Sequence, residues 1–317
     1  MSWSANLASL FLQPVMDAQL RRLLQPQGIP SMDFGQPPGE AALVPASSAS
    51  WRVFKNPVTV FIGGVAAVIL ELAEPAVRAG VWTHSSFRTD PLRRLQRTGL
   101  AAMVTVYGPA SQARRMIDGV VRMHSRVTGI TEHGEAYAAN EEVLLNWVQA
   151  TASWGFVQAY SRYARHLDNG TLTQLYGEAL PAARLYGALG APATVEQMQS
   201  LFDQMVPRLE ASPVIIEFLE ILERAPILPM PARPLQRLLI RAATSLVPAS
   251  LRQQLGLGHR WELGPLQMRL VTMAARLADR TVLPSSPAVQ SCLRMGLPRD
   301  ALYTDHHTRQ RDSHRET

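Results

Sequence analysis

Apolar residues recur at helical spacing along almost the whole chain, and this period restricts the possible folds more than any other feature. Segments with a period of about 3.6 residues are separated by Gly, Pro and Asn-Gly signals that end helices and start turns. The strict alternation that is typical of half-buried strands persists nowhere. We therefore predict an all-α protein, a single multi-helix globular domain with more than about 60% helix, against about 30–35% in ordinary proteins.

The Gly, Pro and Asn-Gly signals that end helices also divide the chain into regions. The predicted helices cover residues 5–25, 58–81, 91–107, 111–128, 140–167, 171–190, 194–210 and 212–224, with further helices within 234–256 and 262–282. Pro75 is expected to bend or split the second helix, and Asp90 with Pro91 should begin the third. Residues 26–50 are rich in Pro, Gly and Ser, so residues 1–50 are predicted to be a helix and an extended linker. Residues 51–303 should form the helical domain, and 304–317 a disordered polar tail.

The net charge of +6 raises the question of a nucleic-acid partner. Lys55 is the only lysine, so almost every basic residue is an arginine, and the arginines are scattered among apolar residues. No basic run is interleaved with aromatic residues, and no zinc-finger or RNA-recognition signature occurs. We therefore expect no nucleic-acid binding.

Cysteine content and hydropathy limit the cofactors and the location. Cys292 is the only cysteine, so a disulfide within the chain and cysteine-based metal motifs are excluded, and any metal must be held by His or carboxylates. The most apolar window, Val58–Leu70, ends at Glu71 and is shorter than the roughly 20 residues that span a bilayer. The N-terminus lacks the basic region of a signal peptide. We expect a cytoplasmic protein with no transmembrane segment.

His124 interrupts an apolar stripe on the predicted helix 111–128. The stripe consists of Ala113, Met116, Ile117, Val120, Val121, His124 and Val127. Arginines and Asp118 cover the other faces, so the ring of His124 should be buried and needs a partner for its nitrogens. Two interpretations remain open at this point: a core histidine bonded to a backbone carbonyl, or an iron ligand with the apolar stripe flanking a porphyrin.

The predicted helix 91–107 carries a polar face. Arg94, Arg97, Thr98 and Ala101 share this face at spacings of three, four and seven residues. Two guanidinium groups beside a hydroxyl suit carboxylates such as haem propionates, although a solvated surface would show the same pattern. His84 precedes this helix in a loop, where its burial cannot be inferred.

The order of several short motifs resembles a known family. The motifs, in chain order, are an apolar helix with Gly63-Gly64, Glu74-Pro75, Val81-Trp82-Thr83-His84-Ser85, Asp90-Pro91, Arg94-Leu95-Gln96-Arg97-Thr98, Val106-Tyr107-Gly108, Arg122-Met123-His124, Tyr137-Ala138-Ala139-Asn140 and Trp147-Val148. The set resembles the haem-dependent oxygenases that include the rubber oxygenases (latex-clearing proteins) and the oxygenase of mycophenolic-acid biosynthesis. The resemblance covers roughly residues 50–167 and continues more weakly to about Pro284.

The resemblance implies a b-type haem between helices and an O2-dependent oxidoreductase that oxidises or cleaves a small apolar substrate, isoprenoid or alkene-containing, with a redox partner. It implies His124 as the iron ligand, with Arg94, Arg97 and His84 as further cofactor-binding residues. Arg94 and Thr98 match the Arg and Thr of the rubber-oxygenase R-x-x-K-T motif and are the implied catalytic residues. Arg97 stands where that motif has a lysine, and a guanidinium has no lone pair to give to iron.

Glu74 stands where family members often carry His before the proline. It is the candidate distal base. Two other classes of protein fit the same chain: a haem protein without turnover, such as a carrier or sensor, and a purely structural helical domain.

Overall fold

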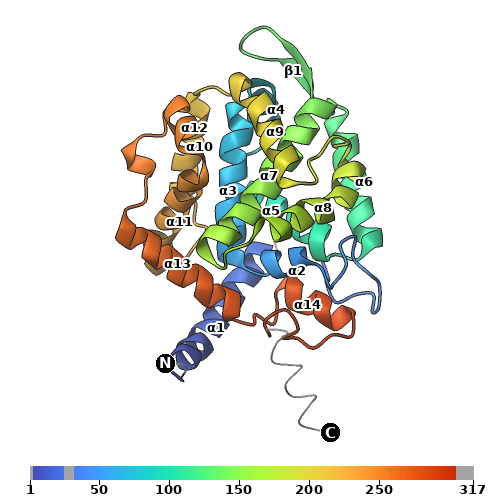
Figure 1. Cartoon of the computed structure of the whole chain (residues 1–317), viewed down its shortest axis with the longest axis vertical. Helices are drawn as coiled ribbons and strands as arrows, with labels where there is room; N and C mark the ends of the chain where they lie inside the picture. Colours follow the sequence, from blue (N-terminus) through green and yellow to red (C-terminus); the bar gives the residue numbers. More distant parts are fainter. Residues whose placement is uncertain (1–2, 25–31, 305–317) are drawn as a thin grey trace.

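The structure is a computed structural model that describes residues 3–24 and 32–304, with side chains described from residue 13 onward. Within these residues, 68% of the chain is helical and the only sheet is one short hairpin. The all-α prediction is therefore confirmed (Figure 1). The tail predicted for 304–317 lies, apart from Thr304, outside the described residues.

Fourteen α-helices follow one another in the described part of the chain. The first seven are α1 (Trp3–Leu24), α2 (Ala49–Phe54), α3 (Pro57–Ala73), α4 (Pro75–His84), α5 (Pro91–Tyr107), α6 (Ala110–His124) and α7 (Glu142–Tyr163). The others are α8 (Asn169–Tyr186), α9 (Val195–Met205), α10 (Pro213–Arg224), α11 (Arg233–Leu246), α12 (Ala249–Gln254), α13 (Pro265–Arg280) and α14 (Pro287–Arg294). Short 3-10 turns lie at Val206–Arg208, Met230–Ala232 and His259–Trp261.

Helix α3 is the central element of the larger hydrophobic core, with α7, α10, α11 and α13 packed around it (Figure 1). Its crossing with α7 is unusually close because two glycines face each other there. A Cβ added to Gly63 would lie 2.6 Å from the carbonyl oxygen of Gly155, so any side chain would push the helices apart. The backbones approach here because neither residue has a Cβ.

The corner between α3 and α4 is sharp. The two helices are bent by 110° at a break next to Pro75, which removes a backbone N–H and so cannot continue α3. Glu74 caps α4 by accepting a hydrogen bond from the amide of Val77 at 2.8 Å. The predicted helix 58–81 is therefore split at Pro75.

The beginning of α5 follows the prediction closely. Asp90 accepts a hydrogen bond from the amide of Arg93 at 3.2 Å, Pro91 is the first helical residue, and the helix ends at Tyr107. Helix α6, in contrast, ends at His124, four residues earlier than predicted.

The chain after α6 forms an antiparallel hairpin of β1 (Thr128–Ile130) and β2 (Ala136–Ala138), which the sequence did not predict. Strands of three residues are too short to show alternation. Gly129 faces the ring of Tyr137, where an added Cβ would lie 2.8 Å from the hydroxyl oxygen. Helix α7 then begins at Glu142, two residues after the predicted cap Asn140.

A second, smaller core joins the two ends of the described chain. Phe34 and Val44 are buried against Trp51, Tyr107 and other residues of α2, α5 and α14. The buried guanidinium of Arg294 donates to the carbonyl oxygens of Phe34 at 2.7 Å and Tyr107 at 2.6 Å. The described part of the stretch expected to be an extended linker is therefore packed on the domain.

No single helix of the described chain has the length and apolar character needed to cross a bilayer. Within the described residues, only α3 and α4 taken together reach that length and apolar character, and a bend of 110° separates them.

Candidate functional site

An apolar cavity of about 240 Å³ lies between α1, α3 and α5. Its apolar lining includes Leu20, Leu23 and Leu24 of α1, Val60, Phe61, Gly64 and Val68 of α3, and Leu92, Leu95, Gly99 and Ala102 of α5. Helix α1 is held over the cavity by side-chain contacts: Asp17 accepts a hydrogen bond from the amide of Ser285 at 2.9 Å, and Gln19 donates to the carbonyl oxygen of Ile227 at 2.6 Å. The cavity is therefore closed in part by an element far from α3 in sequence.

Glu71 is the acidic residue of this cavity. It lies in the last turn of α3, on the same face as Gly64 and Val68. Burial raises the pKa of its carboxyl from 4.5 to about 7, although a hydrogen bond from the Thr151 hydroxyl (3.4 Å) and the charge of Arg94 act in the opposite direction. A carboxyl with such a pKa can hold or release a proton near neutral pH.

Two cationic residues border the cavity: Lys55, which is paired with Asp279, and Arg94. The guanidinium of Arg94 makes no hydrogen bond or ion pair with the rest of the described chain. Burial lowers its pKa, the charge of Glu71 raises it, and Arg97 lowers it. A half-buried guanidinium without a partner is suited to bind an anionic group of a ligand.

His124, the last residue of α6, is half-buried. Its Nδ1 atom is buried and has no hydrogen-bond partner. Burial, and then the positive charge of Arg94, lower the pKa of the ring, so the imidazole is neutral at neutral pH and has a lone pair available. His124 does not itself border the apolar cavity. Arg94 is the link, because its charge acts on both His124 and Glu71.

The other predicted site residues are distributed differently. Thr98 borders the cavity and is also exposed, so it lies at an opening, and its hydroxyl donates to the carbonyl oxygen of Arg94 at 3.1 Å. Arg97 and His84 are exposed and do not border the cavity. The structure thus brings Arg94 and Thr98 to the cavity and His124 near Arg94, but not Arg97 or His84.

Glu74, the predicted distal base, is engaged elsewhere. One carboxylate oxygen caps α4, and the other accepts a hydrogen bond from Arg208 at 2.7 Å. The side chain does not border the cavity. Its carboxylate stabilises the α3–α4 corner, and Glu71, one helical turn earlier, is the carboxyl that the cavity contains. Sequence reasoning missed Glu71, yet a signal existed: an acidic residue in the last turn of an apolar helix, where the helix dipole disfavours negative charge.

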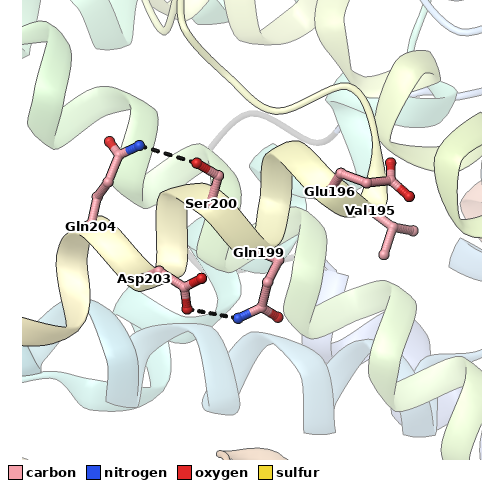
Figure 2. Close-up of a pocket in the computed structure, with 6 residues that line it drawn as sticks. All are labelled: Val195, Glu196, Gln199, Ser200, Asp203 and Gln204. Carbon is pink, nitrogen blue, oxygen red and sulfur yellow. Dashed lines mark hydrogen bonds between the residues drawn. The ribbon is translucent and has the colours of Figure 1, made fainter.

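Two further places on the molecule gather polar side chains. A shallow depression on α9 is bordered by Val195, Glu196, Gln199, Ser200, Asp203 and Gln204. Figure 2 shows that two pairs of these side chains bond to each other along the helix, Gln199 to Asp203 at 2.8 Å and Gln204 to Ser200 at 3.2 Å. All six residues belong to one helix and five are exposed, so this depression has the character of an ordinary helix surface.

Glu132, His133 and Glu210 form a group of three residues with metal-ligand atoms close together. The buried guanidinium of Arg78, however, donates to both carboxylates. His133 also contacts Glu210, with Nε2 2.9 Å from Oε1. Because the guanidinium of Arg78 already pairs with both carboxylates, the group is better described as an ion-pair cluster than as a cation site.

The structure thus combines a helical fold, an apolar cavity bordered by Glu71 and Arg94, and a half-buried His124 on which the charge of Arg94 acts. Residues 51–279 match the family described as "ER-bound oxygenase mpaB/B'/Rubber oxygenase, catalytic domain", and the chain belongs to this family of oxygenases. The resemblance seen in the sequence is thereby confirmed. No curated protein and no solved structure gives a significant match.

Proposed function

We propose that the protein is a haem-dependent oxygenase that oxidises or cleaves a small apolar substrate of the isoprenoid or alkene class. Family membership supports the oxygenase activity. The observation that carries the haem proposal is the buried, unpartnered Nδ1 atom of His124 beside the unpaired cation Arg94. A buried polar atom without a partner is costly, and coordination of a haem iron would supply a partner.

The donor set of this chain fits a b-type haem. His124 is neutral near neutral pH, which is the form that binds iron. Arg94 would hold a propionate through its unpaired guanidinium. When bound, the haem would supply the activation of O2. Arg97 is exposed and its guanidinium has no lone pair to donate, so it is not suited to replace the motif's lysine as an iron ligand.

The rest of the cavity has the character of a substrate site. Apolar side chains of α1, α3 and α5 exclude water and would hold a hydrocarbon chain. Glu71 is the group in this cavity that can exchange a proton near neutral pH, and Thr151 stabilises its ionised form by donating to Oε1. We assign to Glu71 the acid–base role first considered for Glu74.

An absorbance spectrum of the purified protein, oxidised and then reduced with dithionite, tests the haem proposal. We expect a Soret band, and O2 consumption when a prenyl compound is added. Absence of the band after haem supplementation during expression would reject haem dependence. Haem binding without O2 consumption across prenyl and alkene compounds would instead favour the second candidate, a haem carrier or sensor.

A further inference from the structure

Helix α13 exposes an apolar stripe on the surface of the molecule. The stripe consists of Leu266, Leu270, Met273 and Leu277, of which the first three are 70%, 47% and 66% exposed. These positions are spaced by four, three and four residues, so they share one face. The opposite face, which includes Val271 and Ala275, is buried in the core. In Figure 1, α13 runs along the periphery of the molecule.

The charges beside this stripe have one sign. Arg269, Arg276 and Arg280 lie along one side of it, are exposed, and form no ion pair within the described chain. Asp279 is the only acidic residue of α13, and its carboxylate is turned inward, where it accepts a hydrogen bond from Lys55 at 2.8 Å. The outer face of the helix therefore combines large apolar side chains with uncompensated positive charge.

We propose that this face of α13 docks on the surface of an anionic lipid bilayer. Leu266, Leu270 and Met273 would enter the headgroup region, and the arginines would contact lipid phosphates. The stripe is about 16 Å long at 1.5 Å per residue, which suits a helix lying flat on a membrane. This inference rests on the surface alone and is independent of the haem proposal.

The charges argue against protein partners on this face. A second copy packed antiparallel on this stripe, about a two-fold axis across the helix, would bring the same arginines close together, where they would repel each other. The exposed leucines and methionine stand beside unpaired arginines, whereas the centres of protein interfaces are depleted of charged residues.

Vesicle flotation of the full chain tests the proposal. We expect binding to vesicles of phosphatidylcholine mixed with phosphatidylglycerol, little binding to phosphatidylcholine alone, and a decrease in binding as salt is added. The double variant Leu270→Glu with Met273→Glu should bind about tenfold less or weaker still, because two inserted apolar side chains are lost. Arg276→Gln and Arg280→Gln should each weaken binding to anionic vesicles by about fivefold.

Ile130→Glu and Leu189→Glu are matched controls, since these side chains are 71% and 67% exposed in other parts of the surface. Both should bind vesicles like the wild type, and all variants should keep the wild-type circular dichroism. Two results would overturn the proposal. One is absence of binding to anionic vesicles, or binding that the Leu270 and Met273 changes leave intact. The other is a wild-type dimer in solution that these changes dissociate, which would assign the face to a second copy.

Discussion

A histidine at the end of an amphipathic helix can be a core residue or a ligand, and the contacts of its ring nitrogens distinguish the two. His124 has a buried Nδ1 atom without a hydrogen-bond partner, whereas a core histidine would be bonded to a carbonyl oxygen. The stripe of α6 predicted burial of the ring, and the structure gives partial burial. The pattern could not show this, because α6 ends at His124 and the last turn is less covered.

We expect His124→Ala to abolish or severely weaken haem binding while helix content stays nearly unchanged. Alanine favours the helix, and the lost ring affects mainly local packing. A Soret measurement and far-UV circular dichroism on wild type and variant check this. Undiminished haem in the variant would move the iron ligand to another histidine, with His84 the next to change.

Glu71→Gln should change the pH dependence of stability. Burial raises the pKa of the Glu71 carboxyl from 4.5 in the unfolded chain to about 7 in the folded protein. The unfolding free energy of the wild type therefore decreases as pH rises from about 4.5 to about 7, and the decrease is complete above about 7. Above pH 7 the variant should therefore have a higher Tm than the wild type, and its unfolding free energy should be larger by at most about 3 kcal/mol. Near pH 4.5 the two proteins should have nearly the same Tm.

The matched control is Glu74→Gln, which loses the ion pair with Arg208 and should lower Tm at the same alkaline pH. Thermal unfolding curves across this range distinguish the two carboxyls. A lower Tm for Glu71→Gln above pH 7 would show that the ionised carboxylate stabilises the fold, contrary to the prediction.

The site residues differ in how far sequence could predict them. Arg94 and Arg97 share a helical face in the sequence, but only Arg94 is covered by other elements. The spacing of two residues shows that they share one face of a helix, but it does not show which other elements pack against that face. Glu71 is important because α5 and α7 bring Arg94 and Thr151 toward it, and those neighbours are distant in sequence.

At the level of elements, the beginnings of helices were the most predictable features, since Asp90 with Pro91 is a local signal. The β1–β2 hairpin was not predicted, because three-residue strands carry no period and the pairing depends on the close contact of Gly129 with Tyr137. The Gly63-Gly64 pair indicated close packing. It did not indicate the partner, α7, or which of the two glycines is at the contact.

The α3–α7 crossing gives a prediction with an internal control. Gly63→Ala should destabilise the protein by about 1–3 kcal/mol, because the new Cβ meets backbone atoms of Gly155 that cannot move without separating the helices. Gly64→Ala should be tolerated, since its Cβ would meet only the ring of Phe156 at 3.6 Å. Chemical denaturation of both variants measures this. Equal destabilisation by the two changes would contradict the assigned contact.

The contact between His133 of the β1–β2 hairpin and Glu210 should depend on pH. The hairpin projects from one end of the molecule (Figure 1), and His133 near its turn contacts Glu210, whose hydrogen bond and charge raise the pKa of His133. Because the pKa of His133 is higher in the folded protein than in the unfolded chain, the protonated ring stabilises the fold. This stabilisation is complete below the unfolded-state pKa of about 6.5 and is lost as pH rises through the folded-state pKa.

His133→Gln should therefore lower Tm at about pH 5.5 and have little effect at about pH 9, well above the ordinary range of histidine. Thermal unfolding at the two pH values checks this. His84→Gln, an exposed histidine on α4, serves as the control and should have little effect at either pH. A His133→Gln effect that is equal at both pH values would mean that the charge of the ring does not matter.

At the scale of the whole molecule, two hydrophobic cores meet around α2 and the beginning of α3. Phe54 packs against both cores. The neighbouring Lys55 is buried, bonds to Asp279 of α13, and lies 4.6 Å from the centre of the Tyr303 ring. Sequence predicted one large helical domain but could not show this second core, because it joins residues near 34 to residues near 302.

Lys55 provides a probe of this junction because it is the only lysine of the chain. Burial lowers the pKa of its ammonium group, while the charge of Asp279 raises it. Because these two effects oppose each other, we expect the reaction rate of the amine to depend mainly on whether a reagent can reach it. We expect a charged N-hydroxysuccinimide ester to leave Lys55 unmodified in the native protein. The rate of modification should rise with denaturant in parallel with global unfolding, since the side chain is freed only when both cores open.

Peptide mass spectrometry of the acylated protein measures this rate directly. The control is an Arg93→Lys variant, which places a lysine at an exposed position of α5 and should be modified rapidly in the native state. Native modification of Lys55 at a rate close to that of the Arg93→Lys lysine would mean that the reagent reaches it through the cavity that Lys55 borders. That result would show that Lys55 is accessible without unfolding of the whole domain, contrary to the prediction.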